Sequence, residues 1–599
     1  MSGHNEKGDQ ERLNSLFPRV PANRASSMAG ARRDALKLVP TLVGMLPNRV
    51  SSRAGARRDA LKLVPTLVAM LLILAACGNT ISAGTTPTAI SVNRLAVKQE
   101  LTFPNVGIAD SGPLDPAQAS DPNTELIMNM VYSGLVTSDS DLNVVPDQAT
   151  WDVSANNSIY TFHLKPGITF SDGTPVTAQT YVYTLTRALL PEVQSNIAAL
   201  YEGAIVGAND VMKGKTKTLP GVKAIDALTL RITLSKPTPY FLQMLTNAIF
   251  FPLNKQIIDE YGQVDWTKHV VGSGIGAGPF MIQEWVPSVK MVFIPNPYYY
   301  GNKTRLTKVN MIFAGDATTA LTTYRAGQYD FVWNIAAADQ VAAKGLPGFT
   351  RGTQLETDAL FFDNKTPPFD NAVVRQAFAY ATDKATLAHS VFFDSVAPAS
   401  TIIPPGMPSY QESNAGIPYD TNMAKSLLES IYPDVTTIPP ITFSYASSQI
   451  SSQEASALQG MWQNALGIPV TLRSVETTAY NDELSKHQVQ FGFIPWNADF
   501  PDPYDFLTLN LFSTAANNYG DWNNPAFDQA VTQADKALSG DMRMLLYNQA
   551  EQVALQDVGW LPLDHQTLAA IIPSWVQGVR INANGLFFGD WSKVYLMRH

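Results

Sequence analysis

One short segment in the second half of the chain is a candidate for binding chemistry because it holds a carboxylate among aromatic residues and prolines. Residues 495–503 read Pro-Trp-Asn-Ala-Asp-Phe-Pro-Asp-Pro, with Asp499 at their centre. A carboxylate forms a short and strong charge-assisted bond with an ammonium group once water is excluded. The alternative is that Asp499 caps a loop ahead of Pro501. The first interpretation predicts a site for a cationic group, and the second predicts only a turn.

The motifs of common hydrolases and metalloenzymes do not occur in the sequence. Its single cysteine excludes a disulfide framework and a cysteine metal cluster, and its seven histidines are scattered without an H-E-x-x-H spacing. There is no G-x-S-x-G nucleophile segment. Carboxylates alone leave a glycosidase open as a rival interpretation. The glycines within 272–278 fit neither the dinucleotide nor the Walker spacing, so we expect a structural turn there.

Composition and charge also narrow the class of protein. The chain has 599 residues, 45% hydrophobic and 16% charged, which is the balance of a globular protein with several cores. The formal net charge is −9, but the first 76 residues carry 12 Lys or Arg against 5 Asp or Glu, so the rest carries −16. An acidic body argues against nucleic acid as a partner.

The N-terminal region reads as an export signal followed by an anchor. Arg57, Arg58 and Lys62 precede an apolar run at 63–76, which ends in Leu-Ala-Ala before Cys77. The run has about 14 residues, and a bilayer span needs roughly 18 or more. The small residues before Cys77 resemble the lipobox of bacterial lipoproteins, which implies acylation of that thiol and cleavage before it. The alternative is a plain signal peptide with an incidental cysteine.

A local duplication lies within this region. Residues 26–46 recur as 51–71 with two differences, which is a repeat of the signal and not a structural repeat. We therefore treat 1–76 as an extension and signal peptide outside the mature fold. Residues 77–94 are rich in Gly, Thr, Ser and Ala, which predicts a flexible tether.

Beyond the tether, strand-like and helix-like runs alternate, which predicts an α/β protein. The alternation of apolar and polar residues predicts half-buried strands at 158–164 and 228–234. Thr174 and Pro175 read as the N-cap and first position of a helix reaching residue 190. Further helices are expected at 125–135, 371–392, 453–466 and 541–556.

Several short sequence segments, which occur in the same order along the chain, resemble segments of a known family. This is the group of extracytoplasmic solute-binding proteins of oligopeptide, dipeptide and nickel importers, solute-binding protein family 5. The most specific is Phe-Ser-Asp-Gly-Thr-Pro-Val-Thr-Ala at 170–178, which physically is a turn before a helix and so is expected to be architecture. The others are Leu-Asp-Pro at 114–116, Tyr-Ser-Gly-Leu at 132–135, Tyr-Thr-Phe-His-Leu at 160–164, Gly-Ala-Gly-Pro-Phe at 276–280, Tyr-Arg-Ala-Gly-Gln-Tyr-Asp at 324–330, Pro-Pro-Phe-Asp-Asn at 367–371, Ile-Pro-Pro-Gly-Met at 403–407 and Asn-Pro-Ala-Phe-Asp at 524–528.

The resemblance implies an α/β fold of the periplasmic-binding-protein kind, class II type, with two lobes closing over ligand and an additional inserted domain. It places the discontinuous first lobe, domain I, at 95–132, 254–360 and 566–599. The inserted domain II is then 133–253, and domain III, the second lobe, is 361–565. Ligand is expected between the first lobe and domain III.

The resemblance also assigns roles around Asp499. In oligopeptide binders the aspartate of a similar Trp-x-Ala-Asp segment pairs with the peptide's α-ammonium, and that residue here is Asp499. Trp496, Asn497 and Ala498 would run beside the peptide as an added strand. Main-chain hydrogen bonds of this kind do not depend on the side chains of the peptide. Such a receptor can therefore bind many different peptides with high affinity.

Two further groups of candidates follow from the same comparison. The first lobe is expected to meet the ligand at Ser120, Asp121 and Pro122, where the family often has a glutamate and this chain has Ser120. Asp121 could substitute, or could be a solvated loop acid. Lys486 and His487 are candidates for the ligand's carboxylate, or an exposed loop after a helix.

The predicted function is that of a monomeric, lipid-anchored, extracytoplasmic receptor that captures peptides and delivers them to the permease of an ABC importer. No cofactor and no enzymatic activity are expected. A non-peptide solute such as an oligosaccharide or a metal chelate is the first alternative, although Asp499 favours a ligand that carries an ammonium. A sensory or adhesive lipoprotein with the same fold is the second.

Overall fold

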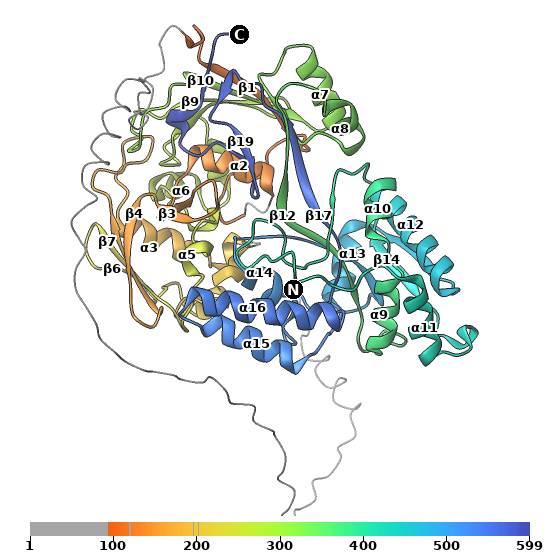
Figure 1. Ribbon diagram of the computed structural model, residues 1–599. Coiled ribbons are helices and arrows are strands. Elements are labelled where there is room, and N and C mark those ends of the chain that lie inside the picture. Colours follow the sequence, from red (N-terminus) through yellow and green to blue (C-terminus); the bar gives the residue numbers. More distant parts are fainter. Residues whose placement is uncertain (1–93, 119–120, 196, 202) are drawn as a thin grey trace, which may run out of the picture. The chain divides into compact units, whose positions relative to one another are not determined.

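The computed structural model describes residues 94–118, 121–195, 197–201 and 203–599 (Figure 1). The predicted signal peptide, Cys77, the tether up to residue 93 and Ser120 lie outside the described residues. In the part of the chain that is described, no helix has both the length and the apolar character that a bilayer span requires.

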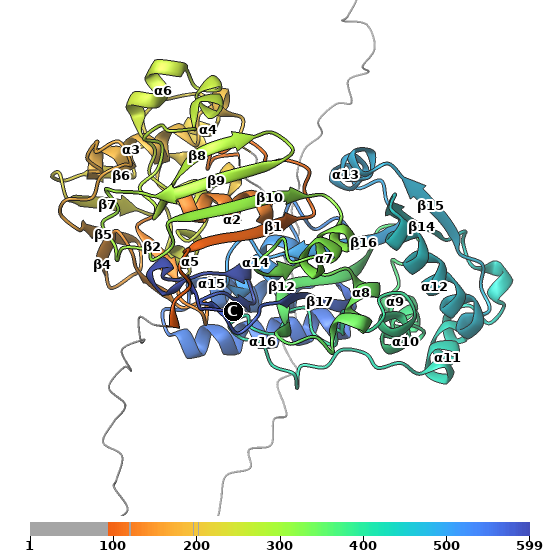
Figure 2. The same cartoon turned by 90° about the horizontal axis from the view of Figure 1, so that it is seen from above.

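The first sheet has the order β1-β10-β9-β8, as Figure 2 shows. Only β1 and β10 run parallel. Alternate residues of β10 are buried, and these side chains pack with helix α2 in one hydrophobic core. The elements are β1 (Glu100–Val106), α2 (Pro122–Val131), α6 (Lys255–Tyr261), β8 (Phe280–Val286), β9 (Lys290–Pro295), β10 (Lys308–Ala314), α7 (Ala317–Arg325), α8 (Ala337–Ala343), β18 (Val576–Gln577), β19 (Arg580–Asn582), β20 (Gly585–Phe587) and β21 (Tyr595–Leu596).

The second sheet is antiparallel, with the order β4-β5-β7-β6 and its own hydrophobic core. Both predicted half-buried strands are confirmed here, as β5 and β7, because a two-residue alternation is a purely local signal. The elements are β2 (Val136–Ser138), β3 (Val144–Pro146), β4 (Ala149–Val153), β5 (Ile159–Leu164), α3 (Ala178–Arg187), α4 (Ala208–Met212), β6 (Val222–Ala224), β7 (Thr229–Thr233) and α5 (Phe241–Met244).

Helix α3 begins later than the sequence predicted. Pro175 forms an isolated bridge with Thr169 instead of opening the helix. Val176 is also held in extended backbone, since its N–H donates to the carbonyl of Ile168 at 2.9 Å. Thr177 is the N-cap, and its backbone N–H is bonded to the hydroxyl of Thr180 in a capping box. The pairing within the turn therefore overrides the Thr-Pro start signal.

The third sheet has the order β11-β17-β12-β16-β14-β15 and contains the two longest strands, β12 and β17, which lie side by side in Figure 1. Phe349, at the start of β12, packs against the first core, whereas Leu360 belongs to a core under α12. The strands are β11 (Val332–Trp333), β12 (Phe349–Phe362), β13 (Ala397–Pro398), β14 (Thr442–Ala446), β15 (Thr471–Val475), β16 (Phe491–Asn497) and β17 (Leu561–Ile571). Two continuous strands thus join separate hydrophobic cores.

Helices cover both faces of this sheet. Leu360 and Phe362 of β12 pack in the core that includes α9, α10, α11 and α12, which lie together in Figure 2. Ala359 and Phe361 face the core formed by α13, α14, α15 and α16. The helices are α9 (Ala372–Tyr380), α10 (Lys384–Ser390), α11 (Thr421–Ile431), α12 (Gln449–Leu466), α13 (Thr477–Ser485), α14 (Pro503–Leu511), α15 (Pro525–Lys536) and α16 (Gly540–Gln556).

The single helix expected at 371–392 is in fact two, α9 and α10. Asp383 is the N-cap of the second, and its carboxylate accepts from the N–H of Thr386 at 3.0 Å. Arg375 lies on the first and donates to Asp557 at 3.2 Å and to the carbonyl of Phe369 at 2.9 Å. Both side chains therefore brace local structure, Arg375 on α9 and Asp383 at the start of α10.

The sequence segments on which the resemblance rests mostly stabilise the fold. Arg187 and Asp115 form a buried bidentate ion pair with N–O distances of 2.7 and 3.1 Å. The glycine-rich turn lies tightly against the end of α2, since a Cβ on Gly276 or Gly278 would collide with the backbone there. The structural turn expected within 272–278 is confirmed.

Candidate functional site

The loop that carries Asp499 is shaped by a different carboxylate. Asp505, buried on α14, accepts the backbone N–H of Asp499 at 2.6 Å, that of Phe500 at 3.2 Å and the indole N–H of Trp496 at 3.2 Å. Burial, followed by the charge of Asp499, raises the pKa of Asp505 well above its usual range. The loop-capping role that was the alternative for Asp499 thus belongs to Asp505.

The Asp499 carboxylate itself has no hydrogen bond or ion pair within the described part of the chain. Water reaches this side chain, yet protein surrounds it closely enough for desolvation to raise its pKa. Its backbone carbonyl accepts from the Asn247 side chain at 3.4 Å. The loop is therefore fixed through its backbone while its carboxylate is left for another partner.

A second carboxylate, Glu125 in the first turn of α2, faces this loop. Its pKa is raised to about 7, first by burial and then by the negative charges of Asp499 and Asp121. Among the described residues, no positively charged side chain forms an ion pair with Glu125 either. Two carboxylates from distant parts of the chain thus repel each other, and a cationic group between them would relieve that repulsion. Sequence reasoning missed Glu125, although an acid in a helix's first turn was a visible signal.

The predicted first-lobe residues lie just before Glu125. Asp121 is the N-cap of α2, and its carboxylate accepts from the N–H of Thr124 at 2.8 Å. Pro122 occupies the first helical position, where a missing N–H costs nothing. Asp121 therefore caps the helix, a role that neither earlier interpretation gave it, and adds negative charge near Glu125.

The backbone of β16 offers one free edge beside Asp499. The N–H of Ala498 donates to the carbonyl of Leu355 at 2.9 Å, so this pair faces inward to β12. Along an antiparallel strand, successive residues direct their backbone N–H and C=O groups to opposite sides. The N–H and C=O of Asn497, next to Ala498, therefore point away from β12. Pro495, two residues earlier, has the same orientation and offers only its carbonyl. On that side β14 pairs with β16 only at Phe491 and Gly492.

The structure does not bring Lys486 and His487 together with Asp499. Both precede β16, whereas Asp499 follows it, and a seven-residue strand spans about 20 Å. Lys486 is paired with Asp482 at 2.5 Å, and His487 lies 3.2 Å from Asp521. Their contacts are those of a surface loop after a helix.

Aromatic rings join the Asp499 loop to the second core. Tyr240, from the segment before α5, stacks on Tyr504 with ring centroids 4.1 Å apart and on Phe500 at 6.0 Å. Arg543 lies over the Tyr240 ring and also forms a buried ion pair with Asp502. These contacts hold the loop between two parts of the molecule.

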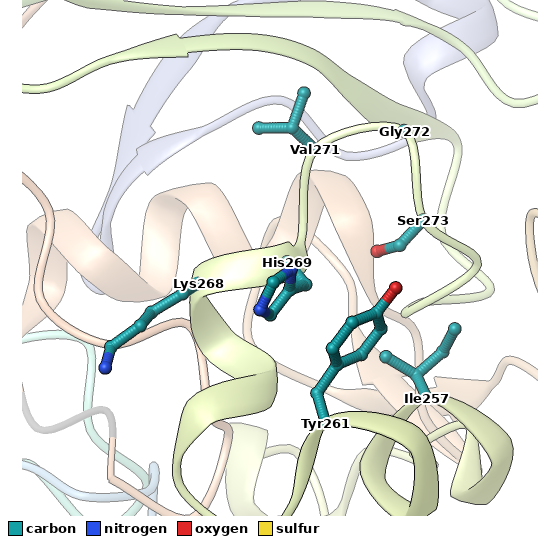
Figure 3. Close-up of a pocket in the computed structure, with 7 residues that line it drawn as sticks. All are labelled: Ile257, Tyr261, Lys268, His269, Val271, Gly272 and Ser273. Carbon is teal, nitrogen blue, oxygen red and sulfur yellow. The ribbon is translucent and has the colours of Figure 1, made fainter.

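A separate surface hollow lies beside α6, where Tyr261 stacks on His269 with centroids 3.9 Å apart (Figure 3). None of the predicted binding residues lines it. In the described ranges, no three or more His, Cys, Asp or Glu side chains are grouped so as to hold a metal ion. We assign no role to this hollow.

The fold is that of a two-lobed α/β solute-binding protein. Residues 143–518 match the model of the middle region of the bacterial extracellular solute-binding proteins, family 5. The chain belongs to this family.

Two curated relatives and one solved structure illustrate the likeness. The periplasmic murein peptide-binding protein MppA of Escherichia coli is 32% identical over 82% of this chain and 91% of its own. The probable deoxycholate-binding periplasmic protein YgiS of the same organism is 30% identical over 78% and 89%. The unliganded open form of MppA superposes with a TM-score of 0.71 at 30% identity, covering 84% of this chain and 99% of that one.

Proposed function

We propose that this protein is the receptor of an ABC importer for peptides with a free N-terminus, whose α-ammonium binds between Asp499 and Glu125. The observation that carries the proposal is that these two carboxylates, from β16's loop and from α2, lie close enough for the charge of Asp499 to raise the pKa of Glu125, while no cation among the described residues pairs with either. An ammonium group bound there gains two charge-assisted contacts and removes the repulsion between the acids.

The peptide backbone would follow the free edge of β16. With its ammonium at Asp499, the chain runs back past Asn497 toward Pro495 and bonds to the outward backbone groups of these residues. Of the three residues first expected to line the peptide, Asn497 then makes the main-chain bonds. Trp496 and Ala498 bond inward to β12 and support the edge.

The relatives leave peptide and non-peptide solutes as the two choices, and the site favours peptides. A bile-acid anion such as deoxycholate, the ligand named for YgiS, would be repelled by Asp499, Glu125 and Asp121 together. MppA is named for a peptide ligand. The carboxylates of Asp499, Glu125 and Asp121 next to the free edge of β16 suit a ligand with a cationic N-terminus followed by a peptide backbone.

Closure, anchoring and delivery complete the proposal. The domain ranges expected from the sequence place the hinge in β12 and β17, the two strands that continue from one core into another. The register of this pair is irregular between Thr353 and Thr357, where bending is easiest. Acylated Cys77 would hold the receptor at the outer membrane surface, from which it delivers peptide to a permease. In membrane fractions of the producing cell, Cys77→Ser should move the protein to the soluble fraction, and retention with an intact N-terminus would contradict the anchor.

Binding to site variants tests the ammonium assignment. Isothermal calorimetry with Ala-Ala-Ala-Ala would compare wild type with Asp499→Asn, Glu125→Gln and the control Glu429→Gln, an exposed acid on α11. Loss of one partner of a desolvated charge pair costs about 3 to 5 kcal/mol, so Asp499→Asn should weaken binding by about a hundredfold or more. Glu125→Gln should weaken it by about tenfold, and the control should not change it. Unchanged affinity in both site variants would contradict the proposal.

A further inference from the structure

A second group of carboxylates lies on the α12 face of the third sheet. Along β12, the residues on this face are Phe362, Leu360, Asp358 and Glu356, so an apolar row becomes acidic toward one end. Asp564 of β17 pairs directly with Asp358. The group is completed by Glu454 of α12, since the charge of Asp358 acts on Glu454 and that of Glu454 acts on Asp564. We call Glu356, Asp358, Glu454 and Asp564 the acidic cluster.

Part of this cluster is deeply buried, and several of its oxygen atoms have no hydrogen-bond partner among the described residues. Asp564 is 2% exposed and Glu454 is 6% exposed. The Oδ2 atom of Asp564, the Oε1 atom of Glu454 and the Oδ1 atom of Asp358 accept no hydrogen bond within the described part of the chain. Gln566 is the donor that does reach the cluster, at 2.8 Å to Asp358 and 3.0 Å to Asp564. Buried acceptors without donors are costly in a folded protein, so these oxygens call for one.

Positively charged side chains in the described part of the chain do not meet this need. No ion pair formed by described residues includes a member of the cluster. Lys384 donates to the carbonyl of Ala399 at 2.8 Å, and His565 bonds to hydroxyls on the opposite face of the sheet. Burial and mutual repulsion accordingly raise the pKa of Glu356 to about 8 and that of Glu454 to about 9.

The cluster adjoins the proposed peptide path. Glu356 is the cross-strand neighbour of Asn497, and Asp358 that of Pro495, so these side chains share one face of the sheet. Glu356 and Asp358 are partly exposed, whereas Glu454 and Asp564 lie deeper. Side chains of an added strand alternate between the two faces. A long side chain on this face, near the start of a peptide bound along β16, therefore extends across β16 toward Glu356 and Asp358, the exposed end of the cluster.

We propose that the acidic cluster is a specificity subsite for a cationic side chain, lysine or arginine, within the first three residues of the bound peptide. This inference rests on the proposed function, because it needs a peptide on the β16 edge. An ammonium or guanidinium supplies several donors and a positive charge to oxygens that lack both. The grouping of the four acids does not fit a metal ion, since no metal-binding geometry occurs among the described residues.

Calorimetry with four peptides separates this inference from the proposed function. The peptides are Ala-Ala-Ala-Ala and the three versions with lysine at the first, second or third position. Wild type should bind at least one lysine peptide about ten- to a hundredfold more tightly than tetra-alanine. Glu454→Gln and Asp564→Asn should each reduce this ratio toward one, while their affinity for tetra-alanine stays that of wild type and shows that they are folded. Glu429→Gln should keep the full ratio.

The contradicting results differ for the two proposals. If tetra-alanine binds but lysine gives no advantage, or if the advantage survives both cluster variants, the cluster is a structural group that shares protons and the subsite is wrong. If 1,5-diaminopentane alone binds as tightly as the best lysine peptide, the cluster recognises a free diamine instead of a peptide side chain. If none of the four peptides binds, the proposed function fails and the subsite fails with it.

Discussion

Asp115 and Asp502 each face an arginine, whereas Asp499 and Glu125 face each other. In the first group, Arg187 and Arg543 neutralise buried carboxylates inside the fold, and both pairs are almost fully enclosed. In the second group, no cation among the described residues pairs with either acid, and burial raises the pKa of Glu125 to about 7 and also raises that of Asp499. The difference separates carboxylates that hold the architecture from those that we propose to bind a ligand.

Removing the carboxylate of a buried ion pair should have the largest effect on stability. Asp502→Ala leaves Arg543 buried and uncompensated, and should lower the free energy of unfolding by about 3 to 5 kcal/mol. Chemical denaturation of the ligand-free protein would measure this. Asp499→Asn is the matched variant, and because the Asp499 carboxylate has no partner to lose among the described residues, this variant should leave stability unchanged or slightly higher. Equal destabilisation by both variants would remove the distinction between the two groups.

Neutralising a member of the acidic cluster should instead stabilise the protein. Glu454→Gln replaces a buried carboxyl that is hard to ionise with a neutral amide that keeps a donor for the neighbouring carboxylates, so it should raise the free energy of unfolding by about 1 to 3 kcal/mol at pH 9. A raised carboxyl pKa means that the native state holds its proton where the unfolded state has lost it. The wild-type carboxyl therefore costs stability as pH rises from about 4.5 toward 9.

The pH dependence provides the control for that variant. At pH 4.5 and below, Glu454 is protonated in the native state, and the difference between Glu454→Gln and wild type should nearly vanish. Denaturation curves at pH 4.5, 7 and 9 would measure how this difference in the free energy of unfolding increases with pH. A difference that is constant across this range would show that ionisation of Glu454 is not its cause.

Exposed pairs should matter least. Lys425 and Glu429 on α11 are 3.8 Å apart and solvent-exposed, and Glu429→Gln should change the free energy of unfolding by less than about 0.5 kcal/mol. The same denaturation assay would test this. A loss as large as that of Asp502→Ala would mean that enclosure does not determine which pairs support the fold.

The sequence predicted local features of the fold better than its helix boundaries. Strands β5 and β7 followed from a two-residue alternation, which depends on immediate neighbours alone. The start of α3 was wrong because Pro175 and Val176 pair with residues before the turn. The break between α9 and α10 was missed because an apolar pattern continued across the Asp383 cap.

The candidate site was only partly predictable for the same reason. Asp499 followed from a resemblance in one short segment, whereas Glu125 faces it only because two distant parts of the chain fold together. The acidic cluster depends on an irregular register next to Asp358, which sets Asp564 opposite it. No spacing within the sequence records such a pairing. Lys486 and His487 lie near Asp499 in sequence, but a full strand separates them in space.

The central claim is that the carboxylates of Asp499 and Glu125 bind a peptide's α-ammonium, and acetylation tests it most directly. Calorimetry on wild type would compare Ala-Lys-Ala-Ala with its N-acetylated form, which keeps most backbone groups and the lysine side chain. The account predicts that acetylation weakens binding by about a hundredfold or more, because it removes the charge that neutralises both acids. Equal affinity for the free and the acetylated peptide would contradict it.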